Sequence, residues 1–171
     1  LMERPFVLII SKFHKPIAIV PVLEVSNFTN LNFDAEIIEW QDNDGFQNAF
    51  NKAFELLGKN FNLGIEGQLM RAFEMQAIME ASNDVTIKNA HKLISKIRLH
   101  KQDYEIENMR KAVKVAEDSL NDTINFVKEG ITEIEIKKLL MQKLLQYGAN
   151  DIAFEPLVLA GSNSALCHGH S

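Results

Sequence analysis

The spacing of apolar residues changes near residue 97, and this change most restricts what the chain can fold into. Before it, short β-branched or apolar runs alternate with segments whose apolar residues recur every three or four positions. Such alternation indicates strands followed by helices. The pattern predicts a mixed α/β (α+β) fold, with one domain over residues 1–97 and a second over residues 98–171.

Strands and helices of the first domain can be placed from short stretches. "PFVLII" (5–10) and "PIAIVPVL" (16–23) predict a β-hairpin, in which Pro21 either moves the second strand to a sheet edge or ends it early. "QDNDG" (41–45) supplies turn formers and a helix N-cap before a helix over 45–58. The other expected elements are strands at 35–40 and 62–67, the latter buried, a helix at 69–82, and a strand leading into a helix at 83–99.

The second domain is expected to begin with two helices. Apolar residues at helical spacing predict one long amphipathic helix over 103–128, ended by Gly130 in the left-handed C-cap position. Thr132 and Glu135 have the spacing of a capping box, in which each side chain accepts a hydrogen bond from the other residue's backbone N–H group. The second helix then runs to Gly148.

The C-terminal residues hold the candidate chemistry. Residues 151–161 predict a strand, and "SNSALCHGHS" a turn that opens a further strand. Cys167 and His168 are adjacent, so in a strand they would point to opposite faces, which argues against a thiol–imidazole pair. His168 and His170 would share a face, but two histidines do not complete a zinc site. A metal-ligand pair and one wall of an active site both stay open on the residues alone.

Composition excludes several classes of protein. A content of 46% hydrophobic and 24% charged residues is typical of a globular chain, and the net charge of −5 argues against nucleic-acid binding. No apolar run approaches the roughly 20 residues of a membrane span. The single cysteine allows no internal disulfide and favours the cytoplasm. The chain starts at Leu1 and stops in a Gly- and His-rich stretch, so we expect truncation at both ends.

Three ordered stretches resemble the Xaa-Pro aminopeptidase and prolidase family. They are "IRLHKQDYEIENMRKAVKVAEDSL" (97–120), "EGITEIEI" (129–136) and "GANDIAFEPLVLAGSNSALCHG" (148–169). The first domain is similar, more loosely, to the creatinase-type N-terminal domain through "PIAIVP", "AEIIEW" and "LGIEG". The resemblance implies that residues 98–171 begin a pita-bread catalytic domain.

The resemblance also implies where the chemistry would lie. It assigns to the intact enzyme two divalent metal ions (Mn, Co or Zn) and a bridging water, with all metal ligands downstream of Ser171 and none in this chain. His168 aligns with the family's substrate-contacting active-site histidine, and Phe154 with an aromatic residue that lines the substrate pocket. Cys167 departs from the family, which usually has proline before this histidine, and residues 159–160 depart from its frequent Ala-Ser.

The implied activity is hydrolysis of the bond preceding proline in a dipeptide or longer peptide. The implied enzyme is a cytoplasmic homodimer with neither a nucleic-acid nor a membrane partner, and this chain alone is expected to be inactive and to bind no metal. Two alternatives share the fold: a metal-free creatinase-like amidinohydrolase, and a non-catalytic module that binds peptides or proteins.

Overall fold

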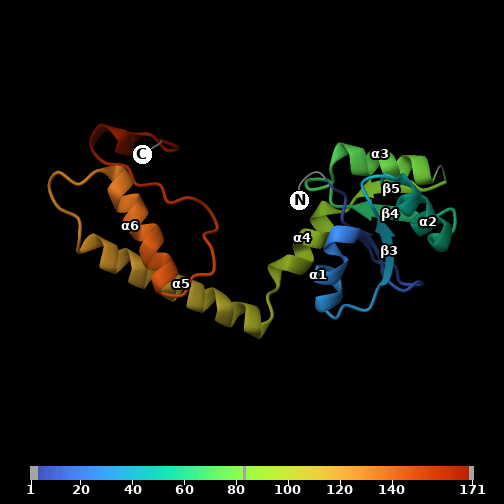
Figure 1. The fold of residues 1–171 in the computed structure, drawn as a ribbon, viewed down its shortest axis with the longest axis horizontal. Coiled ribbons are helices and arrows are strands. Elements are labelled where there is room, and N and C mark those ends of the chain that lie inside the picture. The colour runs from blue at the N-terminus through green and yellow to red at the C-terminus, as the bar shows by residue number, and fades with distance from the viewer. Residues whose placement is uncertain (1–3, 83, 170–171) are drawn as a thin grey trace. The chain divides into compact units, whose positions relative to one another are not determined.

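The computed structural model describes residues 4–82 and 84–169, which divide into two compact units at residues 99 and 100. Helices and strands alternate in the first unit, and two helices dominate the second (Figure 1). The mixed helix-and-strand fold predicted from the sequence is confirmed. Within the described ranges no helix is long and apolar enough to cross a membrane.

A three-stranded sheet organises the first unit. β1 (Val7–Ile9) pairs antiparallel with β2 (Ile17–Pro21), and β2 pairs parallel with β3 (Glu36–Trp40). The predicted hairpin is confirmed. Pro21 is the last residue of β2, which is the central strand, so proline ends the strand and does not move it to an edge.

Both faces of β2 are covered, because alternate residues of a strand point to opposite sides. Ile17 and Ile19 belong to a core cluster with α2 (Gln47–Leu57), whereas Ala18 and Val20 pack with Phe28. Phe28 lies in α1 (Val25–Asn30), a short helix that follows the 3-10 segment η1 (Val22–Glu24) and was not predicted from the sequence.

The rest of the first unit is a strand–helix–strand–helix segment. β4 (Asn62–Ile65) pairs parallel with β5 (Thr86–Asn89), and these strands alternate with α3 (Ala72–Ala81) and α4 (His91–Leu99). All four elements were predicted, but β4 is only half-buried, because alternate residues remain exposed.

The predicted start of α2 is wrong in one respect. Residues 41–45 form the expected turn, but the N-cap is Phe46, whose side chain cannot accept a hydrogen bond. The helix is held instead by its buried face, which includes Phe50 and Phe54. Gly58 ends it with φ = 81°, as predicted.

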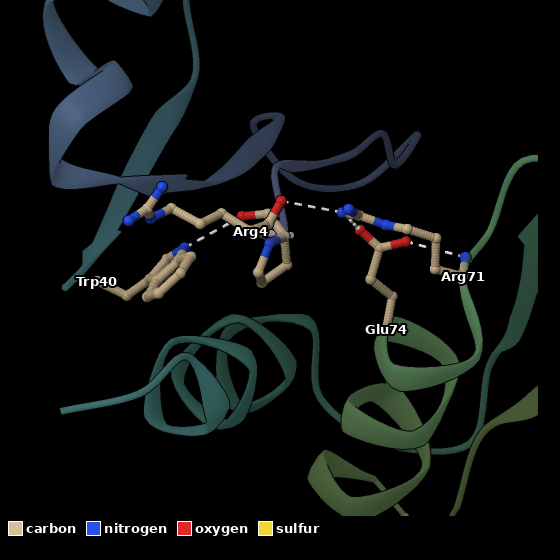
Figure 2. Close-up of polar contacts among 5 residues, drawn as sticks. Arg4, Trp40, Arg71 and Glu74 are labelled. Atoms are coloured by element: carbon tan, nitrogen blue, oxygen red, sulfur yellow. Dashed lines mark hydrogen bonds and ion pairs between the residues drawn. The ribbon is translucent and has the colours of Figure 1, made fainter. Parts of the chain in front are cut away.

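A polar cluster ties the start of the chain to α3 (Figure 2). The indole N–H of Trp40 donates to the Pro5 carbonyl oxygen at 3.1 Å, and the Arg71 guanidinium donates to the Arg4 carbonyl oxygen at 2.9 Å. Arg71 also pairs with Glu74, whose carboxylate accepts the backbone N–H of Arg71 at 3.0 Å. Glu74 is only 6% exposed, and its hydrogen bond with Arg71 raises the pKa of the arginine.

In the second unit, α5 (Asp103–Ile124) packs against α6 (Glu133–Gln146). The ammonium group of Lys143 on α6 reaches the carboxylate of Asp122 on α5 at 2.6 Å. α5 ends at Ile124, so Gly130 does not cap it. Gly130, with φ = 91°, instead forms part of the turn that leads to α6. The capping box of Thr132 and Glu135 is confirmed, as both hydrogen bonds form.

The strand predicted over 151–161 is wrong. Residues 151–160 have no regular secondary structure and are followed by a 3-10 segment, η2 (Gly161–Ala165). A strand needs a neighbour to receive its backbone hydrogen bonds, and both sheets that the described residues form lie in the first unit.

Candidate functional site

The segment that carries the predicted site residues is attached to α6 at two points. Lys137 pairs with Glu155 at 2.8 Å between Nζ and Oε2. Further along, the carboxylate of Glu133 accepts a hydrogen bond from the backbone N–H of Ala160 and others from the Asn163 side-chain amide. The first turns of α6 therefore hold a segment that has no secondary structure of its own before η2.

Two consecutive backbone turns follow the second attachment. The N–H of Leu166 donates to the Asn163 carbonyl oxygen at 2.9 Å, and the N–H of Gly169 donates to the Leu166 carbonyl oxygen at 3.2 Å. Cys167 and His168 are the central residues of this last turn, which confirms the turn expected from the sequence. The predicted onward strand and His170 lie outside the described residues.

Gly169 closes the turn in a tightly packed position, where a side chain would require its neighbours to shift by a few tenths of an ångström. It is buried, and a Cβ atom there would lie 3.2 Å from the Leu159 methyl groups and 3.2 Å from the Leu166 Cβ. This packing joins the end of the turn to the irregular segment before η2. The turn is therefore fixed both by hydrogen bonds and by apolar contact.

The structure presents the two predicted site residues to solvent from opposite ends of this attached segment. Phe154 is 80% exposed and precedes the Lys137–Glu155 ion pair, and His168 is exposed in the turn. Cys167 is exposed as well, and in the described part of the chain its side chain makes no hydrogen bond with His168. An exposed imidazole and an exposed phenyl ring are available to a ligand, and among residues 4–82 and 84–169 no polar side chain forms a hydrogen bond with either of them.

The residues that the structure describes do not fit a two-metal centre. Within residues 4–82 and 84–169 no group of three or more His, Cys, Asp or Glu side chains is placed to hold a metal ion. Glu133 is connected to this turn through hydrogen bonds, but its carboxylate already accepts three of them. Zinc needs three or four protein ligands in one place, and two-metal sites need more.

A cavity in the first unit is a weaker candidate. It has a volume of about 330 Å³ and lies against β1, α2 and β4, with apolar side chains such as Phe50, Phe54 and Met70 in its lining. Binding sites usually combine an apolar wall with a few converging polar groups. The polar side chains in its lining are Ser11, which is half-buried, and Lys12, His14 and Asn62, which are exposed.

Sequence reasoning missed three residues that build the turn: Glu133, Asn163 and Gly169. Glu133 lies 27 and 30 positions from the two residues that it binds. A single sequence holds no signal for pairing at that separation. Only the resemblance, which includes "TE" and "SNSA", marked these stretches at all.

Comparison with known proteins identifies the two units. Residues 2–100 match the creatinase/prolidase N-terminal domain, and residues 107–171 match metallopeptidase family M24. The first match covers more than half of the chain. The chain therefore belongs to the creatinase/prolidase N-terminal domain family, and an M24 region follows that domain.

Relatives and solved structures agree with this assignment. An uncharacterized peptidase of Staphylococcus aureus (strain bovine RF122 / ET3-1) is 29% identical over 167 residues, which are 98% of this chain and 46% of the relative. A prolidase from Thermococcus sibiricus superposes with a TM-score of 0.85 at 25% identity over 99% of this chain and 46% of its own. A prolidase from Pyrococcus furiosus superposes with a TM-score of 0.74 at 25% identity over 95% of this chain and 45% of its own. The chain thus spans about half the length of the proteins it matches.

Proposed function

We propose that this chain is part of a metal-dependent peptidase that cleaves the bond preceding proline. The observation that carries the proposal is the match of residues 107–171 to metallopeptidase family M24, in the region where the structure presents His168 on a fixed, exposed turn. Named relatives support the substrate class, because solved structures with this fold include an Xaa-Pro dipeptidase and prolidases.

The cofactor in this proposal belongs to the intact protein. Two divalent ions, Mn, Co or Zn, would lower the pKa of a bound water and polarise the substrate carbonyl. Since the described residues do not supply a ligand set, those ligands would come from outside this chain, and the chain alone would be inactive. Its own residues would contact the substrate.

His168 is proposed as the catalytic group of this chain. An imidazole N–H can donate a hydrogen bond to a carbonyl oxygen, and this bond strengthens as the oxygen becomes an oxyanion in the transition state. The same imidazole can also relay a proton. The exposure of His168 on a turn held by backbone hydrogen bonds supports either role.

Phe154 is proposed to contribute an apolar wall for the proline ring. The side chain is 80% exposed, so a ligand that covers it would remove apolar surface from water. Truncating Phe154 to alanine is therefore expected to raise KM more than it lowers kcat.

The decisive experiment is the turnover of Xaa-Pro dipeptides by the intact protein with Mn or Co, beside His168→Ala. Loss of one transition-state hydrogen bond is expected to lower kcat about 100- to 1000-fold. His14→Ala, at an exposed histidine of the first unit, serves as the matched control and should keep full activity. Near wild-type turnover in His168→Ala would contradict the assigned role.

The same assay separates the rival functions. Metal-free hydrolysis of creatine, added as a second substrate, without turnover of Xaa-Pro dipeptides would favour a creatinase-like amidinohydrolase. Absence of both turnover and stoichiometric metal uptake would favour a peptide-binding module. Homodimer assembly and a cytoplasmic location remain predictions of the family resemblance, to be checked by light scattering and by cell fractionation.

A further inference from the structure

Glu133 is the first residue of α6, yet its carboxylate binds a segment about thirty residues further along the chain. The backbone N–H of Ala160 donates to Oε1 at 2.6 Å. The Asn163 Nδ2 amide donates to Oε1 at 3.3 Å and to Oε2 at 3.1 Å. Glu133 and Asn163 are both half-buried, which protects these bonds from full competition with water.

The two residues bound by Glu133 bracket the start of η2. Ala160 is its N-cap, and its carbonyl oxygen accepts the backbone N–H of Asn163 at 3.1 Å. Ala160 and Asn163 are therefore held to each other and, separately, to the same carboxylate. Glu133 thus contacts both the N-cap and the first turn of η2.

This attachment continues to the turn that carries His168. The Asn163 carbonyl oxygen accepts the N–H of Leu166, whose own carbonyl oxygen accepts the N–H of Gly169. An unbroken series of hydrogen bonds thus leads from α6 to the residues on both sides of His168. Gly169 adds the apolar contact with Leu159 at the far end.

We propose that Glu133 is a positioning residue: its carboxylate fixes the turn over 166–169 and thereby the place of His168 relative to a bound substrate. The inference rests on the proposed function, because it gives the reason for fixing this turn. Hydrogen bonds to an ionised acceptor are shorter and stronger than neutral ones. A displacement of about 1 Å at a catalytic group can cost about 100-fold in rate.

The structural half of the proposal is tested without reference to activity. Hydrogen–deuterium exchange of the intact protein should show the Ala160 amide exchanging at least about tenfold faster in Glu133→Ala, because one charged hydrogen bond is lost. Glu129→Gln removes the same charge from an exposed position in the preceding turn and should leave the exchange unchanged. Equal exchange at Ala160 in wild type and Glu133→Ala would overturn the attachment.

The functional half is tested by kinetics and by rescue. Glu133→Ala should lower kcat at least about tenfold with little change in KM, and Asn163→Ala, which leaves α6 untouched, should do the same. Adding either change to His168→Ala should lower kcat no further, because both act through His168. Full additivity would overturn positioning in favour of a general loss of stability.

A pair of isosteric variants gives a readout that a purely structural role would not move. Asn163→Asp places a second carboxylate against Glu133 and should lower kcat strongly by repulsion. Combining it with Glu133→Gln places a side-chain amide N–H, a donor, opposite the introduced carboxylate, an acceptor. This double variant should recover most of the lost kcat. Lack of recovery would contradict direct pairing of these two side chains.

The results distinguish failure of this inference from failure of the proposed function. If His168→Ala is fully active, the proposed function falls, while fast exchange in Glu133→Ala still establishes the attachment. If His168→Ala is inactive and Glu133→Ala has normal kcat, the proposed function stands and the positioning role of Glu133 is overturned.

Discussion

The two units of the molecule differ in where their apolar side chains lie. All the buried hydrophobic residues of the described chain fall between Ile9 and Ile78, in the first unit. The buried positions of the second unit are Ser119, Thr123 and Gly169, none of them a large apolar residue. One unit encloses a core, and the other consists of helices and turns with their apolar surface uncovered.

The uncovered surface follows the pattern that made α5 predictable. Large hydrophobic residues that remain exposed recur along this helix: Ile106, Met109, Val113, Leu120 and Ile124. Apolar residues at helical spacing form one face of a helix, and such a face is normally buried against another part of a protein. The first unit is therefore stabilised by its own core. The second unit depends on helix caps, ion pairs and the contacts of α6 with the segment that follows it.

The comparison is tested most strongly by removing a core ring. Phe50 is 0% exposed and packs edge-on to Phe46, with ring centroids 6.0 Å apart. Phe50→Ala should lower the free energy of unfolding of the first unit by about 3–5 kcal/mol, measured by urea denaturation. Val113→Ala on α5, at a residue 56% exposed, should change the free energy of unfolding of the second unit by less than about 0.5 kcal/mol. Similar losses for the two variants would refute the contrast.

The same contrast explains which predictions from the sequence are confirmed. β1 and β2 were found from continuous apolar runs, β3 from alternating apolar and polar residues, and α2 from helical spacing. Each of these patterns arises because buried positions are apolar. α1 was missed because it is six residues long, with one buried residue, too short for a period to show.

The wrong predictions concern segments whose conformation depends on distant partners. Residues 151–161 have a strand-like composition, but the structure attaches them to side chains of α6 and not to another strand. The end of α5 was placed at Gly130 because glycine often terminates helices, but the helix stops at Ile124. Local composition predicted a glycine in a left-handed conformation correctly, but not its role.

For the candidate site, the sequence and the structure contributed different parts. The resemblance supplied His168 and Phe154, and their roles remain predictions. The turn around His168 could be expected from small and polar residues. Its attachment through Glu133 could not, since any of the acidic residues would have served equally well from sequence alone.

Helix capping should matter more for α6 of the second unit than for α2 of the first. The Thr132 hydroxyl accepts the backbone N–H of Glu135 at 3.2 Å, so Thr132→Ala should lower the free energy of unfolding of the second unit by about 1 kcal/mol. α2 has no side-chain cap, so Asn43→Ala in the turn before it should cost less than about 0.5 kcal/mol. Thermal unfolding of both variants checks the pair, and an equal or larger loss for Asn43→Ala would show that α2 also depends on its N-terminal turn.

The smallest expected effect is the pH dependence of the same cap. Hydrogen bonds from the backbone N–H and the hydroxyl of Thr132 lower the pKa of Glu135 below its ordinary 4.5. A carboxyl group with a lowered pKa stabilises the fold above its unfolded-state pKa, and that contribution is lost as the pH falls through the folded-state value. Stability of the second unit should therefore begin to fall below about pH 4.5, and Glu135→Gln should flatten the dependence.

Titration by NMR resolves this effect at the single residue. The carboxyl carbon of Glu135 should titrate with a midpoint below 4.5 in the wild type. Thr132→Ala should move the midpoint only part of the way back, because the backbone N–H, which is the larger cause, remains. In the first unit Arg4 lowers the pKa of Asp42 through side-chain hydrogen bonds and, to a smaller extent, through its charge, so Arg4→Ala should return that midpoint almost completely to 3.8. The assigned causes would be wrong if Thr132→Ala returned the Glu135 midpoint completely to 4.5 while Arg4→Ala returned the Asp42 midpoint only partly to 3.8.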